Sequence, residues 1–424
     1  MDHVYVLDRQ GKPLMPCRPR KARILLQANK AHIARHTPFT IQLDYDAGHR
    51  LQHVTLGVDA GSKTIGISAS TDEHELLAME FKPRNDVVNL LSTRRELRRS
   101  RRNRKTRYRK PRFNNRIGSK HKGWLAPSVE TKIHNHLQAI DLVHKILPID
   151  LIRIETAEFD LQRLKAMLEG KPIPVGTDYQ LGEMYDQYNI RQYVLHRDGY
   201  TCLYCHTSKT KFHVHHLESR KTGSDRPDNL ITLCESCHKK YHKGKISLDG
   251  IQKGRNYRDA SFMGIMRKTL LDRVRRTYPG IPVQETHGYI TKYIRESKKL
   301  LKSHVTDALC IANHPDAERT GVTYLAKPIR SHNRQIHKAN PRKSGIRPRN
   351  QSAKTIHGFK LFDKVDYGNQ TCFITGKRTT GYFMLKTIEG KTVTNSVSYK
   401  KLTLLQHSNA YIIDRKENAV PPHG

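Results

Sequence analysis

Four of the seven cysteines form two C-x-x-C pairs, and these pairs restrict the possible fold more than any other feature. The pairs are "CLYC" at 202–205 and "CESC" at 234–237, while Cys17, Cys310 and Cys372 stand alone. The spacing within each pair lets two thiolates reach one tetrahedral zinc ion. A disulfide framework would be denser and is typical of secreted chains. We therefore interpret the paired thiols as metal ligands: Cys202, Cys205, Cys234 and Cys237.

Histidines and an asparagine surround the cysteine pairs, in "FHVHHLESR" (212–220), "PDNLITL" (227–233) and "CHKKYH" (237–242). Cysteine spacing alone favours a structural zinc ribbon with solvated histidines. His238 and His242, however, are four residues apart, so on a helix they share one face and both can address a metal. Phosphodiester hydrolysis needs a base that works near neutral pH and a divalent cation, and these residue types suit both roles.

A second set of polar side chains is scattered along the chain. Asp59 ends the apolar strand-like run in "LGVDAGSKTIGIS", and Glu155 has the same place in "LIRIETA". His304 and Asp307 are three residues apart in "SHVTDALCIA", which reads as a helix, so they share a face. Each alone is typical of an ordinary cap. The hard oxygen ligands of the three carboxylates, Asp59, Glu155 and Asp307, suit Mg²⁺ or Mn²⁺.

The stretch from Arg94 to Arg116 holds thirteen Arg or Lys residues against the single acid Glu96. It has no Gly or Pro before Pro111, which permits a helix of about five turns. On composition alone it is a solvated charge run or a nuclear address.

The whole chain carries a formal charge of +38, which favours nucleic acid or an anionic membrane as partner. Membrane is the weaker candidate, because no apolar run approaches about 20 residues and the N-terminus lacks a signal-peptide core. We expect a cytoplasmic or nucleoid-associated protein.

Two further segments have a recognisable pattern. Residues from Ala22 to Ala34 have helical spacing with basic residues interleaved. After about Thr320 a polar, basic connector leads to short strand signals that alternate with Gly turns, which predicts a small β-barrel.

The Cys/His segment resembles the ββα-metal module of the HNH endonucleases, and the scattered polar residues resemble the three split pieces of a RuvC-type nuclease with an RNase H-like fold. The order of these pieces, with an arginine-rich helix and an HNH insertion between them, resembles the RNA-guided nucleases of the CRISPR type II class. The chain is too short for their recognition lobe. The transposon-encoded IscB family matches better, since Pro13-Leu14-Met15-Pro16 carries the motif that names its first domain.

The resemblance implies a multidomain α/β fold. Its expected parts are a PLMP domain (1–52), RuvC-I (53–92), a bridge helix (93–120), RuvC-II and linker (121–184), an HNH domain with a Cys₄ zinc site (185–247), RuvC-III (248–318) and a C-terminal β-rich, barrel-like domain (319–424).

The resemblance also implies residue roles. In the HNH module His216 would be the general base, Asn229 would orient it, and His215 and His238 would bind the catalytic Mg²⁺ with His242 as a candidate third ligand. The four cysteines would hold a separate structural Zn²⁺. In the RuvC-like domain the four metal-binding and catalytic side chains would be Asp59, Glu155, His304 and Asp307. The nucleic-acid contacts of the bridge helix would be Arg94, Arg95, Arg98, Arg99, Arg101, Arg102, Arg104, Lys105, Arg107 and Arg109.

The implied activity is RNA-guided, metal-dependent cleavage of double-stranded DNA by a monomeric ribonucleoprotein. A structured guide RNA would pair with one DNA strand, which the HNH site cuts, while the RuvC-like site cuts the displaced strand. The C-terminal domain would read a motif adjacent to the target. Two alternatives stay open: a guide-independent HNH homing or restriction endonuclease, and a non-catalytic, zinc-containing RNA-binding protein. The first leaves Asp59, Glu155, His304 and Asp307 without a role.

Overall fold

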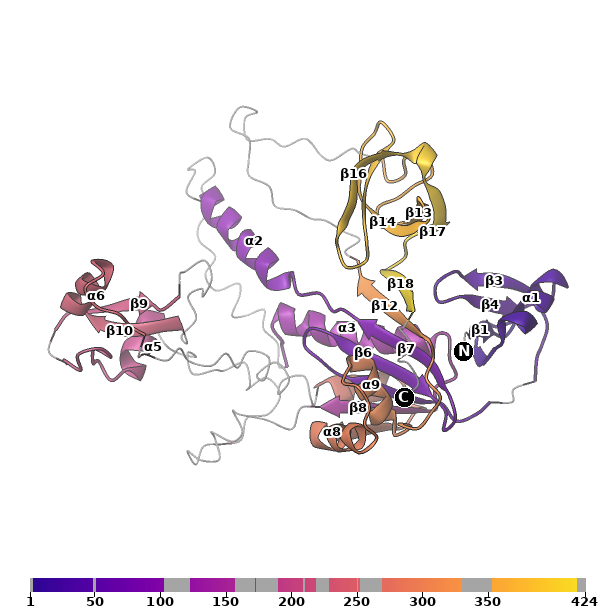
Figure 1. The fold of residues 1–424 in the computed structure, drawn as a ribbon, viewed down its shortest axis with the longest axis horizontal. Coiled ribbons are helices and arrows are strands. Elements are labelled where there is room, and N and C mark those ends of the chain that lie inside the picture. Colours follow the sequence, from indigo (N-terminus) through magenta and orange to yellow (C-terminus); the bar gives the residue numbers. More distant parts are fainter. Residues whose placement is uncertain are drawn as a thin grey trace. The chain divides into compact units, whose positions relative to one another are not determined.

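The computed structural model describes residues 3–48, 51–102, 123–156, 172, 190–208, 210–218, 229–249, 251, 269–329 and 353–417. The chain forms two compact units (Figure 1). One consists of Met1–Glu158 together with Met266–Gly424, and the other is Phe159–Ile265. The second unit is therefore an insertion in the chain of the first.

A seven-stranded mixed sheet is the centre of the first unit. Its strands, in spatial order, are β11 (Val283–His287), β8 (Leu151–Thr156), β5 (Thr55–Asp59), β6 (Ile65–Ser70), β7 (Glu75–Phe81), β12 (Val322–Pro328) and β18 (Tyr411–Glu417). Strands β5, β6 and β7 form a meander of antiparallel neighbours, whereas β8 and β11 run parallel to β5. Parallel strands end at the same edge of a sheet, so the carboxyl ends of β5, β8 and β11 lie together.

Helix α9 (His304–Ala312) lies directly on this sheet, because two glycines leave no side chain between the helix and the strands. A Cβ at Gly57 would lie 1.9 Å from a helix carbonyl oxygen, and one at Gly66 would lie 2.0 Å from that of His304. Ser303 caps the start of the helix, since its hydroxyl accepts a hydrogen bond from the Thr306 N–H. A longer helix, α3 (Pro127–His144), links the meander to β8.

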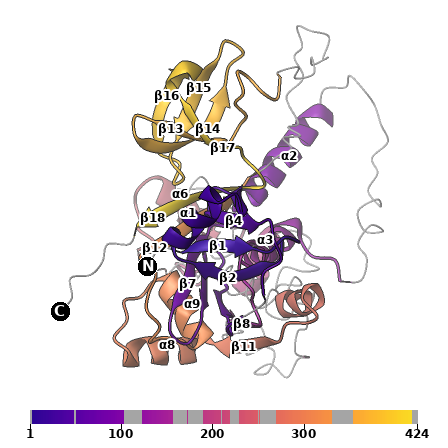
Figure 2. The ribbon, with the colours of Figure 1, turned by 90° about the vertical axis from the view of Figure 1, so that its right-hand side faces the viewer.

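The N-terminal segment forms its own four-stranded sheet, in the order β2-β1-β4-β3. Figure 2 labels three of its strands, β1, β2 and β4. Its elements are β1 (Val4–Leu7), β2 (Pro13–Cys17), α1 (Pro19–Gln27), β3 (Ala31–Arg35) and β4 (Thr40–Leu43). The helical spacing predicted from Ala22 to Ala34 is wrong at its end. Asn29 adopts the left-handed conformation (φ 50°) just after α1, and the next residues form β3. Pairing of β3 with β4 overrides the local periodicity.

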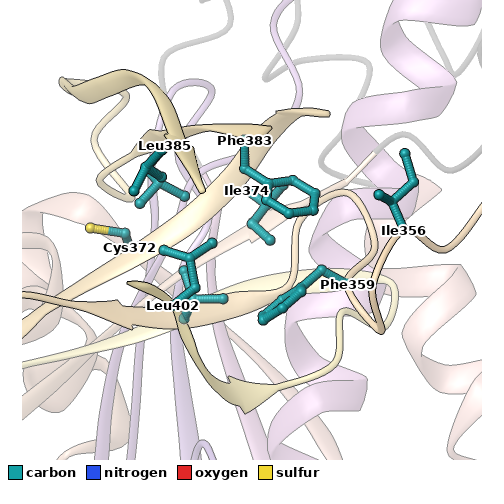
Figure 3. Packing of buried hydrophobic residues seen from close by; sticks show 9 residues of the cluster. Ile356, Phe359, Cys372, Ile374, Phe383, Leu385 and Leu402 are labelled. Atoms are coloured by element: carbon teal, nitrogen blue, oxygen red, sulfur yellow. The ribbon is translucent and has the colours of Figure 1, made fainter. Parts of the chain in front are cut away.

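The C-terminal segment contributes to two sheets. Five strands form an antiparallel sheet in the order β16 (Thr392–Ser398), β15 (Tyr382–Lys386), β14 (Gln370–Lys377), β13 (Lys364–Tyr367), β17 (Thr403–Gln406). Side chains such as Phe359, Ile374, Phe383 and Leu385 point toward one another in its core (Figure 3). This sheet has an open strand order, so closure into a barrel stays a prediction.

Two strands of the segment 319–424 belong instead to the central sheet. Strand β12 pairs with β7 in parallel, and β18 pairs with β12 in antiparallel fashion. The change in sequence character near Thr320 therefore does not coincide with a sheet boundary, because backbone pairing ties these strands to the core across long sequence distances.

The second unit contains α5 (Ile190–Arg197), β9 (Phe212–His216), β10 (Leu230–Cys234) and α6 (Glu235–His242). Strands β9 and β10 form an antiparallel pair. In the first unit, helix α2 (Val87–Arg102) begins six residues before the predicted bridge helix and carries the first part of the arginine run. In the described ranges, no helix has the length and apolarity needed to cross a membrane.

Candidate active sites

Three histidines of the second unit form one compact group. His215 lies on β9 and pairs in register with Ile231 of β10. Helix α6 follows β10 without a loop, and it presents His238 and His242 one turn apart on the same face. One ring nitrogen from each histidine lies within 4.8 Å of the other two. Residues from two elements thus form a group with metal-ligand spacing.

The environment of His215 suits a metal ligand. The residue is 7% exposed, and its Nε2 is buried without a hydrogen-bond partner. Its ring contacts the rings of Tyr241 (4.5 Å between centroids), His238 and His242 (5.3 Å each). Burial, and then the neighbouring histidines, lower the pKa of His215 to about 4. The imidazole is therefore neutral at pH 7, and only the neutral form has a lone pair for a cation.

Asn229 is fully buried beside the end of β9. Its Oδ1 accepts a hydrogen bond from the backbone N–H of Glu218 (2.8 Å), and its Nδ2 donates to the Glu218 carbonyl oxygen (3.0 Å). These bonds fix the backbone two residues after His216, which itself pairs with Leu230. Asn229 therefore holds the chain segment that carries His216. That it orients the His216 ring stays a prediction.

The four cysteines of the two pairs lie together, as their spacing predicts. Their sulfur atoms are all within 4.8 Å of one another. The Sγ atoms of Cys205 and Cys234 are 3.7 Å apart, and the Cys237 N–H donates to Cys234 Sγ (3.3 Å). All seven cysteines are free, and the cluster packs on Leu233 and its neighbours. Four thiols at this separation, with no disulfide between them, fit a tetrahedral zinc ion.

The carboxyl edge of the central sheet gathers the second set of predicted residues. Asp59 and Glu155 are register partners on the parallel strands β5 and β8. His304, at the start of α9, places its Nδ1 2.6 Å from Asp59 Oδ2. This hydrogen bond raises the pKa of His304. Three side chains from distant parts of the sequence thus lie side by side.

Helix α8 (Gly288–Ser297) contacts two of the predicted acids. The Thr291 hydroxyl donates to Glu155 Oε2 (2.5 Å), and Arg295 Nη1 donates to Asp307 Oδ1 (2.5 Å). Burial raises the pKa of Glu155, the Thr291 bond opposes this, and the charges of the nearby acids raise it further. Thr291 and Arg295 were not predicted from the sequence. Their four-residue spacing, which on a helix places two side chains on one face, was the available signal.

The sheet-edge residues do not form a preformed cation site in this structure. Among the described residues, groups with mutual ligand distances within 4.8 Å occur only for the four cysteines and the three histidines. Asp307 is instead paired with Arg295. The structure therefore places Asp59, Glu155 and His304 together. The carboxylate of the fourth predicted residue, Asp307, is engaged by Arg295.

His213 is a further histidine that the sequence prediction omitted. It lies two residues before His215, so it is on the same face of β9. Its ring stacks on that of His238, with centroids 4.9 Å apart and planes 20° apart. Its Nε2 is buried and has no hydrogen-bond partner. The alternation in "HVHH" was the signal that could have indicated it.

The arginine run is described only in part. Arg94, Arg95 and Arg99 are exposed on α2, and Arg98 is half-buried. Arg101 and Arg102 are helical in backbone. The other predicted contacts lie outside the described residues: Arg104, Lys105, Arg107 and Arg109.

Two cavities lie beside the N-terminal strand β1, with volumes of about 460 and 550 Å³. Neither is lined by a predicted site residue.

Two family models match the chain. One is described as RRXRR protein and matches residues 4–180, and the other is described as HNH endonuclease and matches residues 202–244. Anaredoxin of Nostoc sp. (strain PCC 7120) is 36% identical over 66 residues, which cover 15% of this chain and 87% of anaredoxin.

Solved structures of Cas9 proteins are also similar. Streptococcus thermophilus Cas9 in complex with AGGA PAM matches with a TM-score of 0.29 and 15% identity over 45% of this chain and 26% of that chain. The same protein in complex with the AGAA PAM matches with a TM-score of 0.32 and 14% identity over 51% of this chain and 30% of that chain. The Type II-C Cas9 from Actinomyces naeslundii matches with a TM-score of 0.16 and 16% identity over 46% of this chain and 30% of that chain.

This chain spans 26–30% of the length of those Cas9 chains, and TM-scores this low carry no argument about its activity. The family matches are more specific. The RRXRR match contains the arginine run and Asp59, and the HNH match contains the four cysteines and the three-histidine group. On these matches the chain belongs to the IscB-like HNH nucleases.

Proposed function

We propose that this protein is an RNA-guided DNA endonuclease that makes a double-strand break. One observation carries the proposal. The second unit, with its three grouped histidines, is inserted in the chain of the first unit, which has its own acidic sheet edge. Two such centres in one chain suit a nuclease that cuts both strands of a duplex. Under this proposal the HNH site cuts the guide-paired strand and the sheet edge cuts the displaced strand.

At the HNH site, His215, His238 and His242 would hold the divalent cation, since one ring nitrogen of each lies within 4.8 Å of the other two. When bound, Mg²⁺ stabilises the charge that develops on the phosphate and the leaving oxygen. His216 then accepts the proton of the attacking water at a ring nitrogen. Asn229 fixes the backbone after His216 through both of its hydrogen bonds to Glu218. The four cysteines would hold a structural Zn²⁺, which would link β10 and α6 to the Cys202–Cys205 loop.

At the sheet edge, we assign Asp59, Glu155, His304 and Asp307 to cleavage of the displaced strand with Mg²⁺ or Mn²⁺. The strand order around β5 supports this, because it is a meander flanked by parallel strands whose ends meet at one edge. Asp307 forms an ion pair with Arg295. The proposal therefore requires this ion pair to open before Asp307 takes part.

The partners follow from charge. A formal charge of +38 and an exposed arginine row on α2 suit a folded guide RNA and its heteroduplex. We expect the protein to act as a monomeric ribonucleoprotein on nucleoid DNA, in a transposon-associated role. The sheet of β13–β17 is the part to which we assign reading of the target-adjacent motif.

Strand-specific cleavage tests the two-site proposal. The RNA that copurifies with the protein supplies the guide, and a matching duplex carries a different label on each strand. Asp59→Ala should cut only the guide-paired strand, and His216→Ala only the displaced one. If both variants still break both strands, the assignment of one site to each strand is wrong.

A guide-independent HNH endonuclease is the second candidate. It is favoured by the fact that the histidine group is preformed while the sheet-edge ligands are not. Cleavage of DNA by RNA-free protein, with no effect of Asp59→Ala, would support this candidate over the first.

A further inference from the structure

Helix α8 has two faces with different surroundings. Thr291 and Arg295 are buried and bind the acids Glu155 and Asp307. Tyr289 and Tyr293 are 61% and 73% exposed. A helix turns 100° per residue, so the tyrosines lie together on the side away from the acids. One helix thus joins the acidic sheet edge to a pair of exposed aromatic rings.

The first tyrosine is close to the acidic edge along the backbone. Thr286 of β11 is in register with Glu155, and Glu155 is in register with Asp59. Strand β11 is therefore two strand spacings from Asp59, about 10 Å. A Cβ at Gly288 would lie 3.1 Å from Glu155 Oε1, so the chain passes directly beside this carboxylate. Tyr289 is the next residue.

The two rings are arranged as a surface for flat ligands. The Tyr289 ring is stacked with that of His287, with centroids 5.9 Å apart and planes only 9° apart. Tyr293 follows one helical turn later, where side chains of a helix are neighbours. Large aromatic rings are normally covered in a folded protein, since their burial contributes strongly to stability. Two that are mainly exposed on one stripe indicate a ligand surface.

The charge around this stripe fits a polyanion. Lys292 lies between the two tyrosines, and three more lysines follow in the connection to α9: Lys298, Lys299 and Lys302. Two acids oppose them: Glu296 lies 3.8 Å from the Lys292 ammonium, and Asp316 Oδ2 lies 2.6 Å from the Lys298 ammonium. Aromatic rings interleaved with cations are the features with which proteins bind single-stranded nucleic acid, because bases stack on the rings and cations contact phosphates.

We propose that Tyr289 and Tyr293, with His287 behind the first ring, form a base-stacking platform for single-stranded DNA that enters or leaves the acidic sheet edge. The inference rests on the proposed function, since it supplies that edge with its substrate. Bases must be unpaired to stack in this way, so the platform selects a displaced strand over a duplex. It binds within a few nucleotides of Asp59.

Binding of a 12-nucleotide oligo-dT to the full chain tests the platform, with an abasic strand of equal length as the probe that lacks bases. The double variant Tyr289→Ala, Tyr293→Ala should bind oligo-dT about ten-fold more weakly and the abasic strand equally well. The double Phe variant should bind like the parent. The slope of log K against log salt should stay unchanged, because no phosphate contact is lost. Tyr45→Ala, at another exposed tyrosine, is the control.

Photo-crosslinking with a 5-iodouracil-labelled strand adds a readout that other binding surfaces cannot mask. Crosslinks should map to Tyr289 or Tyr293. Crosslinks only elsewhere, or equal weakening for the abasic strand, would overturn the platform. The two hypotheses also separate: if Asp59→Ala cuts both strands but the tyrosine effects appear, the proposed function fails and the platform stands. If Asp59-dependent cutting is present and the tyrosine variants bind normally, the platform alone fails.

Discussion

Gly66→Ala is the substitution that tests most directly how the sheet edge is built. The added Cβ would lie 2.0 Å from the His304 carbonyl oxygen and 2.9 Å from the His304 Cβ. Ordinary contact begins at 3.4 Å, so the start of α9 must move by about 1.4 Å (3.4 − 2.0). A movement of that size along the bond takes the 2.6 Å separation of His304 Nδ1 and Asp59 Oδ2 to about 4 Å, beyond hydrogen-bond range.

Two effects of different size follow from this movement. Overpacking of this kind costs about 1–3 kcal/mol of unfolding free energy, which urea denaturation measures. Misplacement of a reacting group by about 1 Å can cost about 100-fold in rate, so cleavage of the displaced strand should fall by that factor. The guide-paired strand should be cut within about three-fold of the parental rate.

The matched control is Gly321→Ala. Nothing lies within 4 Å of a Cβ at Gly321, and its φ is not in the left-handed range. This variant should unfold and cut like the parent. A Gly66→Ala protein with parental stability would refute the packing of α9 on β6 that the structure shows. If Gly66→Ala loses the expected stability but still cuts both strands at the parental rate, the role of the sheet edge is refuted.

Three further predictions concern other parts of the molecule. Removal of zinc by a chelator should increase hydrogen exchange in residues 202–249 and leave the central sheet unchanged; equal protection before and after would contradict the four-cysteine site. His242→Ala should weaken Mn²⁺ binding to the chain, measured calorimetrically, by at least about ten-fold, whereas unchanged affinity would exclude His242 as a ligand. Burial lowers the pKa of His136 to about 4. Because the unfolded chain then binds more protons, stability should fall by about 3 kcal/mol as pH drops from about 6.5 to about 4. His136→Phe should remove that part of the pH dependence of urea unfolding, and an unchanged pH profile would contradict it.

The HNH site was predictable because its geometry is local. His238 and His242 share a helix face whatever the rest of the chain does, and each C-x-x-C pair fixes two sulfur atoms within one turn. Only the meeting of β9 with α6 needed tertiary structure, and antiparallel pairing with β10 supplies it. The grouping of His215 with the two helix histidines, including His242, is what the structure adds.

The sequence places Asp59 and Glu155 at the ends of two strand-like runs, and the structure shows that the two residues are register partners on neighbouring strands. That the two acids belong to a nuclease site stays a prediction. The partners on α8 were missed, since nothing local indicates which face of that helix meets β8. Hydrogen bonds from Thr291 and Arg295 depend on a packing that only the whole sheet determines.

The two sites therefore differ in how they are held, and this difference has a consequence for activity. The histidine group depends on one short hairpin and one helix, with the cysteine cluster beside it. The acidic edge depends on three segments that are far apart in the sequence, around residues 59, 155 and 304. The inserted second unit, Phe159–Ile265, lies between the last two of them. Within it, Asp307 is neutralised by Arg295 in a pair whose side chains are 10% and 15% exposed. Breaking such a buried pair leaves an unpaired charge, which is costly unless a cation replaces the guanidinium. Under the proposed function, the acidic edge therefore needs a divalent cation that displaces Arg295 from Asp307, whereas the three histidines are already grouped at metal-ligand spacing.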